Sequence, residues 1–332
     1  MQGVRSQLNK TQRGILSSFE RVMERPIKRD FAAKVDSLQE LDPVVCQALQ
    51  DQLKPGEAIL TLIKVPSQVI DEIQEKDSKR FFRKLKRILT PDWVLALTGE
   101  RLLLAASFEP GASPDTLSIP FENILSLQCG TILLFSWIEF RTIDEGSLRR
   151  TRIYYNTVSS RIFEALSASL RGSMHAMHGK NGLAASSTQD NQQILDPLSY
   201  KFKNLIGLYL LLPDEGIRSL IFRPAMWNRT MGFFQRQTAA NLAVVSSQSY
   251  FMLAEENLDQ AKVNYGMIYS YFPMRFVKSV SVGVEEGRLQ LVVCVQNQQV
   301  GQELRIDFPA EREKELRAFA GQFDQQQAGL SG

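Results

Sequence analysis

Short apolar runs separated by turn-forming residues dominate the chain between residues 58 and 155. Strands at such close spacing are typical of an antiparallel sandwich or barrel. The pattern predicts seven strands, at residues 58–65, 93–97, 101–106, 116–119, 125–129, 131–142 and 148–155. The run at 158–170 differs, because Ile162, Phe163, Leu166 and Leu170 recur three and four residues apart. That spacing predicts an amphipathic helix, which Gly172 ends.

The same pattern returns 153 residues later, so the chain is one module used twice. The segment IPFENILSLQCG at 119–130 matches FPMRFVKSVSVG at 272–283, including the prolines Pro120 and Pro273 and the glycines Gly130 and Gly283. Both segments predict a proline-started helical turn that leads into a strand. A second closing helix then begins at Pro309, with apolar residues three and four apart.

The segments outside the two modules predict helices and a linker. Residues 11–25 form a basic amphipathic pattern, which either packs on the first module or lies on a membrane surface. A helix is expected at 43–53, with Asp42 as its cap. We therefore predict an N-terminal helical segment at 1–53, modules at 54–171 and 195–324, a flexible linker at 172–194 and a disordered tail at 325–332.

Composition narrows the class of protein. The chain has 332 residues, of which 44% are apolar, and a net charge of only +3. A charge this small disfavours nucleic acid as a partner unless basic residues cluster. Three widely spaced cysteines indicate neither a disulfide framework nor a zinc site, and no apolar run is long enough to span a bilayer. We expect a cytoplasmic protein, or one that is peripheral on the inner face of the membrane.

The order of these elements resembles the pleckstrin-homology-like superfold, in particular bacterial PH-like and GRAM-type domains. The likeness is carried by Trp93-Val94-Leu95-Ala96-Leu97-Thr98, by the segment beginning Ile119-Pro120, and by the closing helix. It implies a mainly β fold with α-helices, made of two PH-like barrels of seven antiparallel strands, each capped by a C-terminal helix. Eukaryotic PH domains usually carry a tryptophan in that helix, where this chain has Phe163 and Phe319.

The connection after the first strand holds the most distinctive side chains. It contains six cations and no anion in nine residues, and the resemblance implies that this loop meets anionic head groups. Phe81, Phe82, Leu85, Ile88 and Leu89 lie at helical spacing, so a short helix here would present aromatic rings flanked by charge. The predicted lipid-binding residues of this loop are Lys79, Arg80, Phe81, Phe82, Arg83, Lys84, Lys86 and Arg87.

The second module has an aromatic pair in the same place, with fewer charges. Its predicted lipid-binding residues are Trp227, Arg229, Phe233, Phe234 and Arg236. Two other interpretations stay open: the rings pack into the core while the cations are solvated, or the loop binds single-stranded nucleic acid.

Motifs for catalysis are missing from the sequence. It has no glycine-rich phosphate loop, nucleophile elbow or HExxH. His175 and His178 form an HxxH with no nearby ligand, and the pairs Glu255-Glu256 and Glu285-Glu286 fall at strand ends. We expect a protein that is not an enzyme, has no cofactor or metal, and binds an anionic membrane surface. The alternative is a scaffold or oligomerising module that binds another protein or a second copy of the chain.

Overall fold

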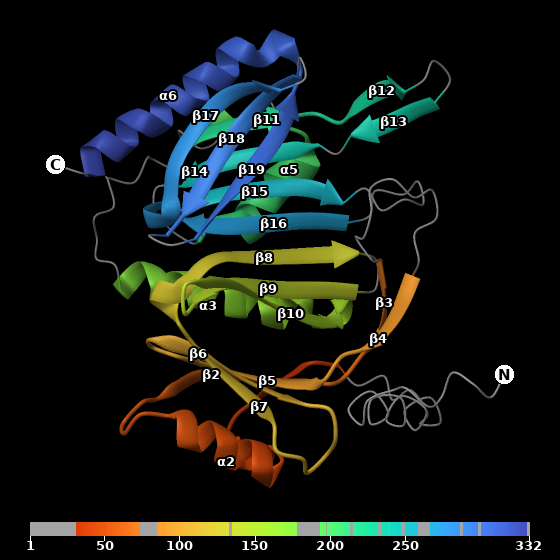
Figure 1. Ribbon diagram of the computed structural model, residues 1–332, viewed down its shortest axis with the longest axis vertical. Coiled ribbons are helices and arrows are strands. Elements are labelled where there is room, and N and C mark those ends of the chain that lie inside the picture. The colour runs from red at the N-terminus through yellow and green to blue at the C-terminus, as the bar shows by residue number, and fades with distance from the viewer. Residues whose placement is uncertain are drawn as a thin grey trace.

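The protein consists mainly of antiparallel strands with few helices, as expected (Figure 1). The computed structural model describes residues 31–73, 85–132, 135–177, 193–196, 198–212, 215–230, 234–238, 240–246, 250–257, 266–285, 288–297 and 300–330. Within these ranges no sheet closes on itself. The chain folds into sheets of five, seven and three strands and two separate two-stranded hairpins.

All seven strands expected in the first copy are present. They are β2 (Ile59–Val65), β5 (Asp92–Thr98), β6 (Arg101–Ser107), β7 (Asp115–Pro120), β8 (Ile124–Ile132), β9 (Phe135–Asp144) and β10 (Ser147–Asn156). A short strand, β1 (Ala33–Val35), pairs with β2, and the long connection contains a hairpin, β3 (Val69–Ile73) and β4 (Leu85–Leu89). Helix α2 (Pro43–Gln52) begins as predicted, because the Asp42 carboxylate accepts a hydrogen bond from Val44 N.

From β11 onward the second copy has the same strands in the same order as the first copy from β2 onward. Its strands are β11 (Ile217–Arg223), the hairpin β12 (Met226–Thr230) and β13 (Phe234–Thr238), β14 (Asn241–Ser246), β15 (Tyr250–Asn257), β16 (Gly266–Pro273), β17 (Val277–Glu285), β18 (Arg288–Gln296) and β19 (Gly301–Phe308). In place of α2 it has a short α-helix, α5 (Tyr200–Leu205), which continues as a single π-helical turn, η4 (Ile206–Leu210).

Strand register confirms the 153-residue repeat in detail. The β8–β9 pair shifts register between Ile124 and Ser126, and the β17–β18 pair does so between Val277 and Ser279. A one-turn helix follows Pro120 (η2, Phe121–Asn123) and Pro273 (η5, Met274–Phe276). The closing helices α3 (Ser160–Met177) and α6 (Glu313–Leu330) begin and end 153 residues apart.

Two helix ends differ from expectation. Helix α3 continues through Gly172 to Met177, because one glycine weakens a helix without ending it. His175 therefore lies in its last turn, while His178 is outside the described residues. Helix α6 extends to Leu330, so most of the predicted tail at 325–332 is helical.

The seven-stranded sheet belongs to both copies. Its order is β10-β9-β8-β16-β15-β14-β11, and the copies join where β8 pairs with β16 along five residue pairs, from Thr131–Met267 to Leu127–Tyr271 (Figure 1). The five-stranded sheet β1-β2-β5-β6-β7 contains only first-copy strands, and the sheet β17-β18-β19 contains only second-copy strands. The middle sheet is therefore the shared structural element.

Hydrophobic packing crosses the same boundary. The largest core lies under α3, where Tyr155 stacks on Phe163 with ring centroids 3.6 Å apart, and it continues into α5 through Phe202 and Leu205. A second core lies under α6 and includes Leu125 and Ile143 from the first copy among its buried residues. A smaller cluster packs α2 on the outer face of β2, β5 and β6.

The repeated glycines allow a matched test of packing in this sheet. Gly130 lies opposite Trp137, and a Cβ added there would be 2.0 Å from Trp137 Cζ2, whereas one added at Gly283 would be 3.4 Å from Val292 Cγ2. Trp137 is 6% exposed, so its ring has little room to move. We expect Gly130→Ala to lower the free energy of unfolding by about 1–3 kcal/mol in urea denaturation. Gly283→Ala should change it by less than about 1 kcal/mol; equal effects would contradict this packing.

Candidate functional site

The first hairpin carries part of the predicted lipid-binding loop. Residues Lys79, Arg80, Phe81, Phe82, Arg83 and Lys84 lie outside the described residues. Lys86 and Arg87 lie in β4, where they are the register partners of Glu72 and Asp71. The expected short helix is wrong for Leu85–Leu89, because this segment pairs with β3 as a strand. Its apolar spacing fits both periodicities, which is a known ambiguity of short runs.

The second hairpin is the counterpart of the first. Trp227 and Arg229 lie in β12, Phe234 and Arg236 lie in β13, and Phe233 is outside the described residues. Pairing places the midpoint of the first hairpin at residue 79 and that of the second at residue 232, again 153 residues apart. Both hairpins lie on the same side of the molecule in Figure 1.

A second candidate site lies between the copies, where α3 faces the π-helical turn η4 over strand β16. The hollow there is about 410 Å³, and a neighbouring one of about 440 Å³ shares part of its lining. Both are lined by the same four polar side chains: Arg161, Glu164, Tyr209 and Tyr269. Volumes of this size are typical of small-molecule pockets.

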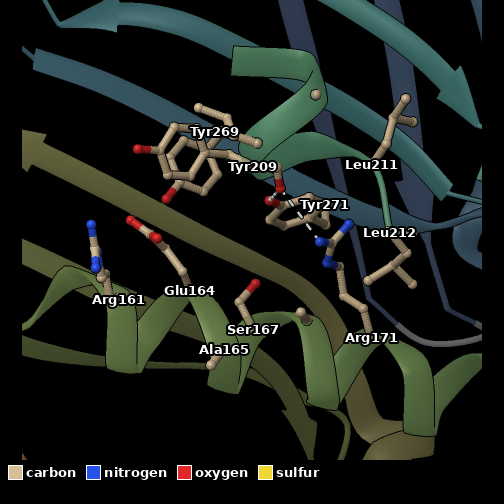
Figure 2. A pocket seen from close by; sticks show the side chains of 13 residues that line it. Arg161, Glu164, Ala165, Ser167, Arg171, Tyr209, Leu211, Leu212, Tyr269 and Tyr271 are labelled. Carbon is tan, nitrogen blue, oxygen red and sulfur yellow. Dashed lines mark hydrogen bonds between the residues drawn. The ribbon is translucent and has the colours of Figure 1, made fainter. Parts of the chain in front are cut away.

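The four polar side chains converge on the hollow without satisfying one another. Figure 2 shows Glu164 rising from α3 toward Tyr209 and Tyr269, with Arg161 one turn away on the same helix. Arg161 is exposed and Glu164 is half-buried, and in the described part of the chain neither side chain makes a hydrogen bond or an ion pair. Desolvation raises the pKa of the Glu164 carboxyl above its ordinary value, and Arg161 offsets only part of this. Desolvation also raises the pKa of Tyr269 well above its ordinary value.

The other end of the hollow is closed by a buried guanidinium. Arg171 is 3% exposed, and its Nη1 donates to Leu210 O at 2.6 Å, at the carbonyl end of η4. Its guanidinium carbon lies 4.1 Å from the ring centroid of Tyr271, whose hydroxyl donates to Tyr209 O (Figure 2). Tyr250 in turn donates to Arg171 O at 2.9 Å. These contacts fix the C-terminal half of α3 against the second copy.

The sequence did not predict this hollow, although a comparison of equivalent positions in the two copies shows which side chains are special to it. The counterparts of Arg161 and Glu164 in the second copy are Lys314 and Arg317. The counterpart of Tyr269 in the first copy is Thr116. The fold therefore forms without these side chains at the equivalent positions. Arg161, Glu164 and Tyr269, which differ between the copies, lie where the two copies meet.

The buried carboxylate of Glu139 has a structural role. Glu139 is fully buried on β9 and accepts hydrogen bonds from Arg141 Nε at 3.0 Å and from Arg150 and Arg152 Nε at 2.6 Å each. Both of its oxygens are thus occupied.

Of the glutamate pairs at strand ends, Glu256 and Glu285 have cationic partners, whereas burial raises the pKa of the Glu255 carboxyl and Arg223 offsets part of that rise. Glu256 pairs with Lys201 at 2.7 Å and Glu285 pairs with Arg305 at 2.6 Å, while Glu286 lies outside the described residues. Over the ranges given above, no cluster of three or more His, Cys, Asp or Glu side chains could hold a metal ion. No described helix is both long and apolar enough to cross a membrane.

Comparison with known proteins leaves the family open. No family model and no curated protein sequence matches this chain. The PH-like similarity therefore rests on the residues and element order given above.

The raised pKa of Glu164 gives a pH-dependent prediction. Below its ordinary value of 4.5, Glu164 is protonated in the folded and the unfolded chain, so it costs no stability. Above its raised folded pKa it is ionised in both states, and the desolvation cost is complete. We expect Glu164→Gln to raise the melting temperature at pH 7 by about 1–2 °C, a small effect because solvent screens this half-buried group, and not to change it at pH 4.

Differential scanning fluorimetry of both proteins from pH 4 to pH 8 measures this difference. Glu311→Gln, at an exposed carboxylate in the turn before α6, is the control for the loss of one negative charge. A melting temperature of Glu164→Gln that falls below the wild-type value at pH 7 would contradict a desolvated, unpartnered carboxylate.

Proposed function

We propose that the protein is a non-catalytic adaptor that docks on an anionic membrane surface through its two hairpins, β3–β4 and β12–β13. The observation that carries this proposal is their placement. Both copies extend a hairpin at the same register position, and both hairpins lie on one side of the molecule (Figure 1). A flat charged surface is the partner that two arms on one side contact together.

Charge and aromatic content support the same partner. In the paired strands of the first hairpin, Lys86 and Arg87 lie opposite Glu72 and Asp71, so the net charge of these four residues is close to zero. The attraction would therefore come from Lys79, Arg80, Arg83 and Lys84, which lie between β3 and β4 in the sequence. A cation near an anionic membrane surface contributes about 1 kcal/mol, and that contribution decays within a Debye length. Phe81 and Phe82 would add interfacial insertion.

Two contacts are stronger than one. The second hairpin carries fewer charges, with Arg229 and Arg236 beside Trp227 and Phe234. Once one arm is bound, the other meets the surface at a high effective concentration, so weak contacts combine. We infer that the first hairpin supplies most of the affinity and that the second orients the protein.

We also interpret each copy as a PH-like barrel. Support comes from the strand groups, four strands and then three followed by a closing helix, which occur in this order in both copies. In this interpretation the hairpins are the elongated connections after the first strand, where PH-like domains commonly meet anionic head groups.

Protein binding is the second candidate, favoured by one edge strand. β10 forms an edge of the seven-stranded sheet and is paired along its whole length of 10 residues only with β9. An extended segment of another protein can add to such an edge. Arg150 and Arg152 on this strand share the single carboxylate of Glu139, so the edge keeps a positive charge that would favour an acidic partner.

Co-sedimentation with vesicles of phosphatidylcholine and phosphatidylserine tests the membrane proposal. We expect binding that weakens between 50 and 300 mM salt, and a loss of about 10-fold or more for Lys84→Glu with Arg87→Glu, because four units of charge change at one arm. Arg229→Glu with Arg236→Glu should weaken binding less. Phe81→Ser with Phe82→Ser should weaken binding at every salt concentration.

The matched control is Lys34→Glu with Lys278→Glu, an equal charge change at exposed positions outside the hairpins. If this control weakens binding as much as the hairpin variants, net charge and not the hairpins determines the interaction. If no variant and no salt concentration changes sedimentation, the membrane proposal fails and binding at the β10 edge becomes the leading candidate.

A further inference from the structure

We propose that the hollow between α3, η4 and β16 binds a small zwitterion, a molecule that carries both an ammonium and a phosphate or carboxylate group. Nothing in the proposed membrane docking requires such a site. The inference depends on the side chains that line the hollow and on where they stand in the repeat.

The charges in the hollow match both ends of such a ligand. Arg161 and Glu164 are one helical turn apart, a spacing at which opposite charges on a helix normally pair. Here they do not pair with each other, and neither forms an ion pair with any other described residue. A ligand with an anionic and a cationic end would satisfy the guanidinium and the carboxylate together.

The two tyrosines and Glu164 form the part of the site that would bind the ammonium group of the ligand. The Tyr209 and Tyr269 rings lie 5.8 Å apart, and Figure 2 shows the Glu164 carboxylate directed toward them. Their hydroxyls can accept hydrogen bonds from an ammonium, and their ring faces attract a cation. Glu164 provides the counter-charge in surroundings that already disfavour its ionised form, and a bound cation would relieve that cost.

The pattern of the repeat argues against a purely structural role for these groups. Helices α3 and α6 begin and end 153 residues apart and both close a core. Yet α6 has Lys314 and Arg317 at the positions of Arg161 and Glu164. Because a closing helix tolerates two cations there, the carboxylate of α3 is not needed for folding. The carboxylate occurs only on α3, the closing helix that faces the other copy.

Isothermal titration calorimetry of the full chain with O-phosphoethanolamine tests the site. We expect one ligand to bind per chain, and ethanolamine alone or inorganic phosphate alone to bind at least about 10-fold more weakly, because each leaves one charge of the hollow unmatched. Glu164→Gln and Arg161→Gln should each weaken O-phosphoethanolamine by about 10-fold or more. Tyr269→Phe should weaken it less.

The matched controls are Lys314→Gln and Arg317→Gln, at the equivalent positions of α6, which should bind O-phosphoethanolamine like the wild type. A second arm uses uncharged vesicles of phosphatidylcholine and phosphatidylethanolamine. Binding to the free compound alone identifies a soluble ligand, and Glu164-dependent binding to these vesicles as well identifies a lipid head group.

The proposal is overturned if O-phosphoethanolamine does not bind, or if the α6 variants weaken it as much as the α3 variants do. Loss of binding to anionic vesicles in the hairpin variants leaves this result unchanged, because those variants do not alter the hollow. Failure of this site and failure of the membrane proposal are therefore distinguishable.

Discussion

The hydrogen-bonded pairing of β8 with β16 is the constraint on which the rest of the structure depends. A three-stranded group from the first copy and a four-stranded group from the second would each expose an unpaired edge, which proteins generally cover. Joining the two edges removes both and fuses the copies into one sheet. Gln128 Nε2 donates to Ser270 Oγ at 3.0 Å across the junction, and Arg275 Nη2 donates to Phe121 O at 3.1 Å. The hydrophobic cores consequently cross the boundary between the copies.

This junction decides what the two equivalent helices face. Helix α6 packs on its own copy, at β17 and β11, whereas α3 meets the lead-in turn of the next copy. That turn is π-helical, and such turns leave backbone groups in unusual positions. The buried guanidinium of Arg171 satisfies its carbonyl end, where a cation is favoured by the helix dipole.

Local signals in the sequence predicted much of the fold, and nonlocal ones did not. The seven strands, the proline-led turns and the Asp42 cap depend on neighbouring residues, so their patterns could be read directly. The β3–β4 hairpin was missed, because the spacing of Leu85 and Ile88 fits a helix as well as a strand. The β8–β16 pairing was not predictable, since any exposed edge is a possible partner. The hollow depends on that pairing and was missed with it.

The two candidate sites relate to the duplication in opposite ways. The hairpins are repeated, with an aromatic pair at the same place in both copies, so a function based on them gains from having two arms on one side. The hollow is not repeated, because a chain with two copies has only one place where a closing helix faces the following copy. Duplication thus produces a pair of equivalent hairpins and, at the junction, a single site that one copy alone could not form.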